Sequence, residues 1–299
     1  MNDRLRERLS GVFAPLTTPF RDDRVDEKGL AANVEKMNAT GLLGYFVLGT
    51  NGEFKALSLD ERWRVLRAVV RHRGKDKVVM AGCGAESTHE TLELVRKAAG
   101  LGADMASLLP PSFFPKRMSV EVMERYVREV ADASPVPVLL YNNPSVAAGV
   151  TIRLELLRRL AGHPRVAGIK DSSKETYREN LTAASESFFV LAGSAGYYLD
   201  LLRSGGTGGV LSLANVFPEE CARLHRAQTT GQTAEADRLN ALLVELNTQV
   251  SGSFGVAGVK AAMDLVGFAG GLPRRPHVGL KPEEVDKLRS ALRASGFGG

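Results

Sequence analysis

The segment Val-Ala-Gly-Ile-Lys-Asp-Ser-Ser, residues 166–173, is a short apolar stretch that ends in a lysine. Gly168 leaves room for another group two residues before Lys170. Burial at the end of a strand disfavours the ammonium form of a lysine, and the neutral amine can then attack a carbonyl carbon. The segment therefore predicts Schiff-base chemistry at Lys170. An ion pair between Lys170 and Asp171 is the structural alternative, and it is the commoner arrangement for a lone Lys-Asp pair.

Apolar segments alternate with amphipathic ones on both sides of this strand, which is typical of repeated βα units. The expected strands cover residues 11–17, 42–50, 77–82, 104–109, 136–141, 166–170, 188–192 and 208–213. The second of them, LLGYFVLGT, is almost wholly apolar, as expected when both faces of a strand are covered. Eight such units by about residue 230 predict an α/β fold, a (β/α)8 TIM barrel. An open doubly wound sheet is the alternative.

Helix signals occupy the intervals between these strands. Ser58 with Glu61 and Ser87 with Glu90 have the spacing of capping boxes, and Pro218 is suited to the first turn of a helix. Three more helices are expected at residues 234–249, 258–267 and 282–294, without accompanying strands. We therefore divide the chain into a barrel, residues 1–230, and a C-terminal helical extension, residues 231–299. The extension is expected to pack beside the barrel or against another subunit.

The composition excludes several classes of function. The 299 residues are 44% hydrophobic, and the net charge of +5 comes from scattered basic residues, so no nucleic-acid partner is expected. The chain has no apolar run of about 18 residues and no signal-peptide core, which predicts a cytoplasmic protein without a membrane span. We found no metal-ligand spacing and no nucleotide-binding motif, so neither metal nor cofactor is expected. Cys83 and Cys221 are expected to be buried thiols, and Cys83 lies near a strand end where it could line a pocket.

Polar residues follow several of the expected strands, and in a barrel these strand ends meet at one face. Thr50 and Asn51 lie in a turn with two glycines, where backbone N–H groups and side chains can hold a carboxylate. An ordinary Asn-Gly turn is the alternative. Tyr141 ends the fifth strand, beside the sixth, so its hydroxyl can reach Lys170. A tyrosine hydroxyl bonded to Thr50 suits the proton transfers of imine chemistry, although a locally satisfied core tyrosine has the same sequence signature.

The ends of the seventh and eighth strands contain glycine, so their backbones can approach a ligand closely. These ends are Ala-Gly-Ser-Ala-Gly at residues 192–196, with Gly193 and Ser194, and Gly-Val-Leu-Ser at residues 209–212, with Leu211. Tight turns between helix and strand explain the same glycines. The two segments are therefore candidate, rather than established, parts of a binding site.

Four motifs occur together: GTNGE at 49–53, YNNP at 141–144, GIKDSS at 168–173 and LAGSAG at 191–196. In this order and at nearly these spacings, they resemble the dihydrodipicolinate synthase and N-acetylneuraminate lyase superfamily, from about Gly11 to Leu292. Within it the chain is most similar to 4-hydroxy-2-oxoglutarate aldolase. The segments that carry this similarity are GTNGE, AGCGAEST at 81–88, LAGSAG, LANV at 213–216 and the tail at 255–276.

The resemblance implies a homotetramer, a dimer of dimers, whose barrels form an imine between a small 2-oxo acid and a lysine on the sixth strand. By this resemblance Lys170 is the Schiff-base residue, Tyr141 the proton donor and acceptor, and Thr50 the relay partner of Tyr141. The substrate contacts expected from the resemblance and the strand ends are Thr50, Asn51, Gly193, Ser194 and Leu211, the last through its backbone. No metal or cofactor is implied.

Two departures from the family pattern bear on the substrate. Phe113 stands where the family has a tyrosine that enters the relay of the neighbouring subunit, and residues 145–149 lack the arginine that dihydrodipicolinate synthases place after YNxP. The missing arginine argues against dihydrodipicolinate synthesis. The similarity of the quoted segments to 4-hydroxy-2-oxoglutarate aldolase makes reversible aldol cleavage to pyruvate the first expectation. The alternatives are 4-hydroxy-tetrahydrodipicolinate synthesis, dehydration or aldol cleavage of a 2-oxo-3-deoxy sugar acid, and a catalytically silent carboxylate-binding barrel.

Overall fold

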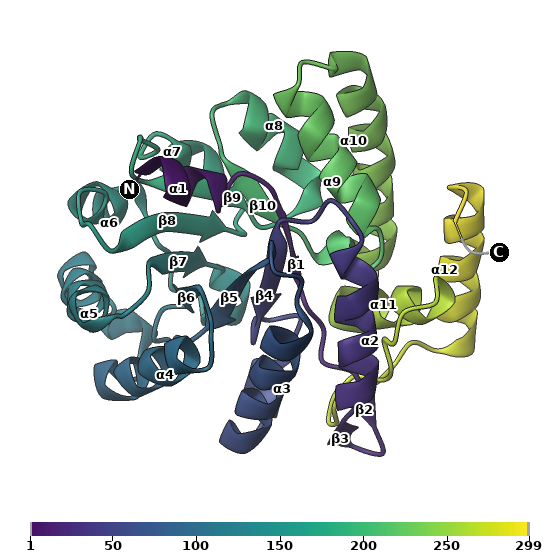
Figure 1. The fold of residues 1–299 in the computed structure, drawn as a ribbon, viewed down its shortest axis with the longest axis horizontal. Helices are drawn as coiled ribbons and strands as arrows, with labels where there is room; N and C mark the ends of the chain where they lie inside the picture. Colours follow the sequence, from purple (N-terminus) through teal and green to yellow (C-terminus); the bar gives the residue numbers. More distant parts are fainter. Residues whose placement is uncertain (1, 298–299) are drawn as a thin grey trace.

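The computed structural model describes residues 2–297, in which eight parallel strands form a closed barrel (Figure 1). The barrel strands are β1 (Val12–Pro15), β4 (Gly44–Val47), β5 (Val78–Gly82), β6 (Met105–Leu108), β7 (Val138–Asn142), β8 (Val166–Asp171), β9 (Phe189–Ala192) and β10 (Gly208–Val210). Sequence neighbours pair from β4 to β10, and β1 closes the ring by pairing with both β4 and β10. The predicted (β/α)8 barrel is confirmed, and the open sheet is wrong.

Helices surround the barrel, because each strand is buried on both faces and needs an outer apolar layer. They are α2 (Glu27–Asn38), α3 (Leu59–His72), α4 (Thr88–Gly100), α5 (Val120–Ala133), α6 (Leu154–Leu160), α7 (Tyr177–Leu181), α8 (Tyr198–Arg203) and α9 (Pro218–Thr229). Ser58 and Glu61 form the predicted capping box reciprocally at α3. At α4 the Ser87 hydroxyl accepts from the Glu90 N–H, but the return bond is absent from the described structure.

Several predicted boundaries differ from the structure. The expected strand 42–50 ends at Val47, because Leu48 adopts a left-handed conformation with φ of 60° and the following residues turn. The expected strand 208–213 ends at Val210, since residues 212–215 form a 3₁₀ turn. The short elements α1 (Asn2–Glu7), α7 and the hairpin of β2 (Phe20–Arg21) and β3 (Arg24–Val25) were not predicted. They are too short to show a sequence period.

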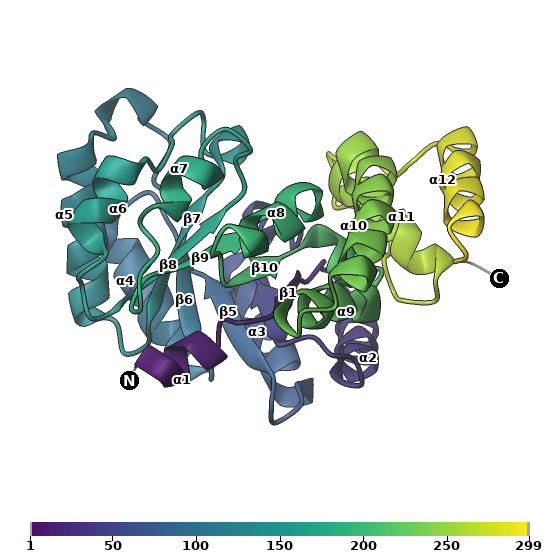
Figure 2. The same ribbon diagram turned by 90° about the horizontal axis from the view of Figure 1, so that it is seen from above.

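The C-terminal helices α10 (Thr233–Asn247), α11 (Ser253–Leu265) and α12 (Pro282–Ala294) lie together on one side of the barrel, opposite α4 to α6 (Figures 1 and 2). A π-helical turn at Thr248–Gly252 joins α10 to α11. The helix expected at 258–267 begins earlier, at Ser253, and is kinked at Gly255, whose φ is 56°. Leu243 and Met263 belong to the same apolar cluster as the barrel strands, so the extension packs against the barrel.

No helix of residues 2–297 is long and apolar enough to cross a membrane.

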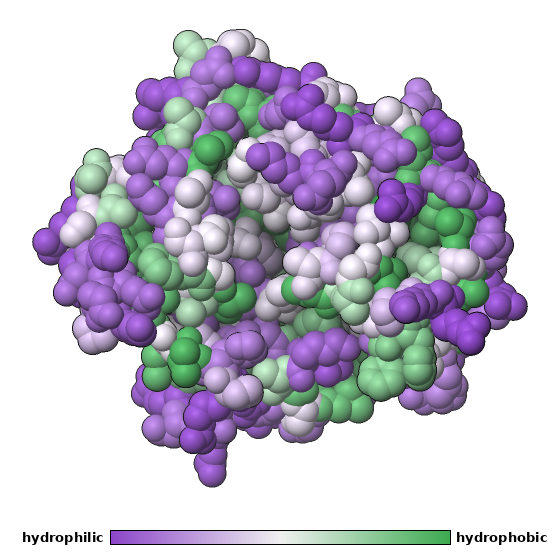
Figure 3. All heavy atoms as spheres, turned by 180° about the vertical axis from the view of Figure 1, so that it is seen from behind, coloured by the Kyte–Doolittle hydropathy of each residue, from purple (hydrophilic) through white to green (hydrophobic). Residues whose placement is uncertain are grey.

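The face drawn in Figure 3 is hollowed near its centre, where the residues are pale or green and therefore less hydrophilic than those at the rim. Side chains that follow the carboxyl ends of the strands line a cavity.

Candidate active site

Lys170 lies on β8 directly opposite Tyr141 on β7, inside the barrel. Its side chain is only 4% exposed, and its Nζ lies 3.9 Å from the centre of the Tyr141 ring and 4.9 Å from that of Phe46. Burial lowers the pKa of Lys170, and the neighbouring Tyr141 hydroxyl opposes this shift without reversing it. An amine in such surroundings is able to act as a nucleophile at a lower pH than an exposed lysine.

Asp171 does not pair with Lys170. Among residues 2–297, no carboxylate lies within 4.0 Å of the Lys170 Nζ. The Asp171 carboxylate instead accepts hydrogen bonds from four donors, which are Asn142 Nδ2, Thr176 Oγ1, Ser173 N and Asn180 Nδ2. Burial nevertheless raises the pKa of Asp171. The ion pair that was the structural alternative is therefore wrong, and Asp171 ties β8 to its neighbours.

Gly168 sets how closely β8 approaches β9. Its φ is 146°, and a Cβ at this position would lie 1.9 Å from the Phe189 carbonyl oxygen. The room that the sequence suggested beside Gly168 is thus filled by the backbone of β9. The register between β7 and β8 also shifts between Val138 and Leu139, which brings Tyr141 opposite Lys170. A side chain at position 168 would collide with the β9 backbone, so glycine is needed on the strand that holds the lysine.

The Tyr141 hydroxyl makes the predicted hydrogen bond to Thr50, with 3.1 Å between Tyr141 Oη and Thr50 Oγ1. It also accepts a hydrogen bond of 2.8 Å from Asn143 Nδ2. Burial opposes ionisation of Tyr141, but the charge of the Lys170 ammonium, together with these hydrogen bonds, outweighs it and lowers the pKa of Tyr141. The Tyr141 hydroxyl is therefore hydrogen-bonded to Thr50 and Asn143, and the Lys170 Nζ lies beside the Tyr141 ring.

The turn after β4 has the features of an anion-binding turn. Leu48 and Glu53 have φ angles of 60° and 52°, and between them the N–H groups of Thr50 and Asn51 donate to no backbone carbonyl of the described residues. Asn51 is largely buried, and its Nδ2 donates to Ser212 Oγ over 2.8 Å. Ser212 was not predicted. Two unused N–H groups beside a buried amide can hold a carboxylate.

The other predicted contacts lie at the same end of the barrel, with most of their polar groups engaged. The Gly193 N–H donates to the Asp171 carbonyl over 2.7 Å, and a Cβ at Gly193 would collide with Ser172. The Ser194 hydroxyl accepts from the Gly196 N–H in its own turn. The Leu211 N–H donates to the Phe13 carbonyl, and its carbonyl accepts from the Ala214 N–H. Substrate binding by Gly193, Ser194 and Leu211 stays a prediction.

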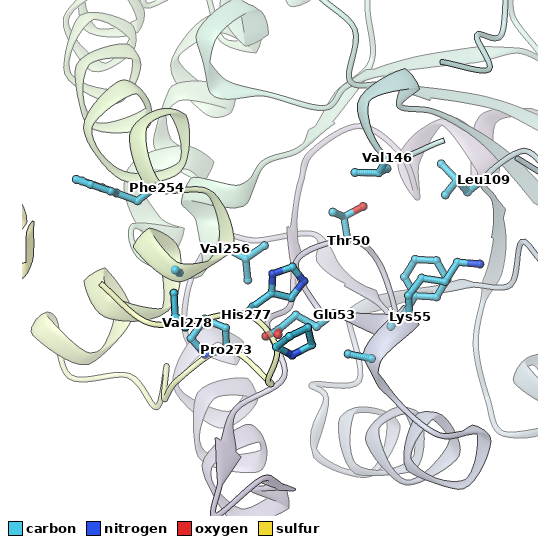
Figure 4. A pocket seen from close by; sticks show the side chains of 14 residues that line it. Thr50, Glu53, Lys55, Leu109, Val146, Phe254, Val256, Pro273, His277 and Val278 are labelled. Atoms are coloured by element: carbon cyan, nitrogen blue, oxygen red, sulfur yellow. The ribbon is translucent and has the colours of Figure 1, made fainter. Parts of the chain in front are cut away.

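A cavity of about 650 Å³ adjoins Thr50. Thr50, Leu109 and Val146 follow the carboxyl ends of β4, β6 and β7, which places this cavity at the face where barrels carry their sites. The C-terminal extension supplies the opposite wall. Figure 4 shows Val256 and His277 on that side, with Thr50 between them and Val146. The lining is mostly apolar.

Asn143, Ser212 and His277 lie at or near this site but were not singled out from the sequence. Asn143 belongs to the quoted YNNP motif, and its place two residues after Tyr141 was the available signal. Ser212 follows the glycines of the eighth strand. His277 lies in a segment without a motif, more than 200 residues from Thr50 along the chain, and no local pattern could have placed it beside the cavity.

Cys83 and Cys221 are both buried, as predicted. Burial raises the pKa of the Cys83 thiol to about 12. Its neighbours Gly82 and Gly84, rather than Cys83, line a small cleft beside Tyr141. Within residues 2–297 there is no group of three or more His, Cys, Asp or Glu side chains arranged to hold a metal ion.

The fold and the comparisons with known proteins define a barrel enzyme of the lyase class. The model of the dihydrodipicolinate synthetase family matches residues 8–295, and the chain belongs to this family. It is 32% identical to a probable mitochondrial 4-hydroxy-2-oxoglutarate aldolase of Emericella nidulans, over 97% of this chain and 96% of that protein.

It is also 35% identical to a 4-hydroxy-tetrahydrodipicolinate synthase of Methanothrix thermoacetophila, over 94% of this chain and 95% of that protein. A solved structure of a monomeric dihydrodipicolinate synthase variant matches with a TM-score of 0.91 and 26% identity, over 97% and 98% of the two chains. These relatives carry the names of different activities. Their names therefore leave open which reaction this enzyme performs.

Proposed function

We propose that the protein is a class I aldolase that forms an imine between Lys170 and a 2-oxo acid and cleaves a 4-hydroxy-2-oxo acid to pyruvate and an aldehyde. The observation that carries the proposal is a buried lysine amine that has no carboxylate partner among residues 2–297 and lies against the ring of a tyrosine at a strand end of the barrel. Burial favours the neutral form of a lysine amine, which imine formation requires.

The steps of the proposed reaction use the residues described above. The Lys170 amine adds to the keto carbon, and loss of water gives the protonated imine. The C3–C4 bond breaks when the C4 hydroxyl loses its proton and the imine takes up the electron pair, which releases an aldehyde and leaves an enamine. Protonation and hydrolysis of the enamine return pyruvate and the free amine. Tyr141, bonded to Thr50, is the proposed donor and acceptor of these protons.

The 2-oxo acid carboxylate is proposed to bind at the turn of Thr50 and Asn51, whose N–H groups donate to no backbone carbonyl in the described part of the chain. Gly193, Ser194 and the Leu211 backbone are proposed to line the same end of the pocket. The part of the substrate beyond C3 would then extend into the 650 Å³ cavity, between Val146 and the C-terminal wall. His277 is the side chain of that wall best suited to donate a hydrogen bond to this part of the substrate.

We take 4-hydroxy-2-oxoglutarate as the first substrate to test, because segments of the sequence resemble its aldolase and a relative of that name aligns over nearly the whole chain. 4-Hydroxy-tetrahydrodipicolinate synthesis is the second candidate, supported by the name of another relative. Dehydration or aldol cleavage of a 2-oxo-3-deoxy sugar acid is the third. We also propose a homotetramer, a cytoplasmic location, and activity that survives incubation with EDTA.

The test is to incubate the protein with pyruvate and other 2-oxo acids in the presence of sodium borohydride and to map the adduct by mass spectrometry. We expect one adduct, on Lys170. Cleavage of 4-hydroxy-2-oxoglutarate is then compared with the condensation of pyruvate and aspartate semialdehyde. No adduct with any 2-oxo acid would refute the mechanism, and an adduct with only the condensation activity would refute the aldolase assignment.

A further inference from the structure

Two successive asparagines follow Tyr141, and their side chains have different hydrogen-bond partners. Asn142 is fully buried, and its side chain bonds Asp171, Thr176 and the backbone N–H of Ile152. It therefore joins β7, β8 and the following loop. The Asn143 side chain makes two hydrogen bonds within the described residues, and neither is to the backbone. Its Nδ2 donates to the Tyr141 hydroxyl over 2.8 Å, and its Oδ1 accepts from Ser145 Oγ over 2.7 Å.

The local backbone holds Asn143 in this position. Pro144 follows it and begins a 3₁₀ turn that ends at Val146. A residue before proline is restricted to extended conformations, and Asn143 has a φ of −151° and a ψ of 83°. The Val146 N–H donates to the Asn143 carbonyl over 3.2 Å. The amide is thus presented to Tyr141 by a turn rather than by a flexible loop.

This arrangement sets the direction of the hydrogen bonds. An amide nitrogen only donates, so the Tyr141 oxygen is the acceptor toward Asn143. The proton of Tyr141 is then left for Thr50 Oγ1, 3.1 Å away, or for a bound substrate. Thr50 in turn lines the 650 Å³ cavity. The chain of donors thus runs from Ser145 through Asn143 and Tyr141 to Thr50, entirely within one subunit.

We propose that Asn143 is a positioning residue for Tyr141, a role that rests on the proposed aldolase function. It directs the Tyr141 proton toward Thr50 and the substrate, and it stabilises the tyrosinate that forms when this proton is transferred. In that transfer the O–H bond of Tyr141 breaks, its electron pair stays on the phenolic oxygen, and the Asn143 N–H bonds remain intact. A hydrogen bond to an ionised oxygen is shorter and stronger than one to a neutral hydroxyl.

The test compares Asn143→Leu, which removes the donor at similar volume, with Asn143→Asp, which keeps the shape but places a carboxylate beside the hydroxyl. Loss of a donor that faces the reacting oxyanion costs roughly 10²- to 10³-fold in kcat. Since Asn143 acts through Tyr141, we expect kcat to fall roughly 10- to 100-fold in Asn143→Leu and further in Asn143→Asp. The yield of the pyruvate adduct on Lys170 and the thermal midpoint should stay unchanged.

A second readout needs no substrate. Ultraviolet difference titration, with Tyr141→Phe as the reference that assigns the signal, should show Tyr141 ionising at higher pH in both Asn143 variants. Ser145→Ala leaves the Asn143 donor in place and is the matched control. It should shift the pH at which Tyr141 ionises by less than the Asn143 variants do. An unshifted Tyr141 titration, or an unchanged kcat in Asn143→Leu, would overturn the proposal. So would a parallel fall of kcat, adduct yield and thermal midpoint, because that pattern indicates a purely structural residue.

This design separates the inference from the function on which it rests. If the wild-type protein forms no adduct with any 2-oxo acid, the aldolase proposal fails, whereas the tyrosine titration still decides whether Asn143 controls Tyr141. If the adduct forms, 4-hydroxy-2-oxoglutarate is cleaved and the titration does not move, the aldolase stands and the role of Asn143 is refuted.

Discussion

The barrel and the C-terminal extension each bury a lysine, and the two lysines have different surroundings. Lys170 on β8 is 4% exposed and Lys260 on α11 is fully buried. Burial lowers the pKa of both. The Lys260 Nζ donates to Glu53 Oε1 over 2.6 Å and to the Leu272 carbonyl over 2.9 Å. Both amines also face aromatic rings, Phe20 for Lys260 and Tyr141 with Phe46 for Lys170, so the difference lies in the hydrogen-bonded carboxylate.

Burial lowers the pKa of both lysines, so the two differ in the groups that surround the amine. At Lys260 the Glu53 carboxylate stabilises the ammonium form and opposes the effect of burial on the pKa. The second carboxylate oxygen of Glu53 accepts from the Arg274 N–H over 2.8 Å, so this ion pair anchors the segment that carries His277. Lys170 has no such partner in the described structure. Lys260 therefore holds the cavity wall in place, whereas Lys170 is the lysine that we propose reacts with the substrate.

The largest expected effect is that of Lys170→Ala. We expect activity to fall at least about 10⁴-fold, because the group that forms the covalent intermediate is lost. The borohydride adduct should disappear as well, as checked by the intact mass and by peptide mapping. Lys260 should carry no adduct in either protein. An adduct on Lys260, or one that persists in Lys170→Ala, would contradict the distinction between the two lysines.

Tyr141→Phe should lower kcat by roughly 10²- to 10⁴-fold, the usual range for a positioned general acid–base. Affinity for pyruvate should change little, because the proposed carboxylate turn is intact. The matched control is Tyr45→Phe, which removes a buried hydroxyl that donates to Asn38 Oδ1 over 2.8 Å, away from the site. If both variants kept similar activity, water would carry the protons and the role of Tyr141 would be wrong.

Lys260→Met should leave the Glu53 carboxylate buried without its partner. Breaking a buried ion pair from one side costs about 3–5 kcal/mol, so the free energy of unfolding should fall by about that amount. Urea denaturation measures this change in the free energy of unfolding. The double variant Lys260→Met with Glu53→Gln should regain part of the loss, since no unpaired charge remains. A change below about 1 kcal/mol in the single variant would show that the pair does not anchor the extension.

The sequence was sufficient for the features that depend on local pattern. The strand and helix alternation predicted the barrel, and the order of strands in a closed barrel put Tyr141 next to Lys170. Strand ends were less predictable, because Leu48 and Ser212 begin turns whose conformations no apolar pattern encodes. The Glu53 and Lys260 pair joins residues 207 apart in the chain, and such pairs are decided by packing. His277 was not predicted, because its place beside the cavity is also decided by packing between distant parts of the chain.

The smallest effect is expected for Phe113→Tyr. Phe113 is 75% exposed in this chain and packs edge-on against Phe114, with 4.9 Å between ring centres. Its N–H donates to a Glu86 carboxylate oxygen over 2.9 Å, which fixes the loop.

Because Thr50, Tyr141 and Asn143 already form a connected hydrogen-bonded group within one subunit, which we propose as the relay, an added hydroxyl at position 113 should change turnover by no more than about 2-fold. Phe114→Tyr, with Phe114 66% exposed, is the matched control. If Phe113→Tyr alone raised turnover by about tenfold or more, a second copy of the chain would have to bring this residue to the relay. The relay would then be incomplete within one subunit, and the Tyr141 arrangement seen here would be only part of the catalytic site.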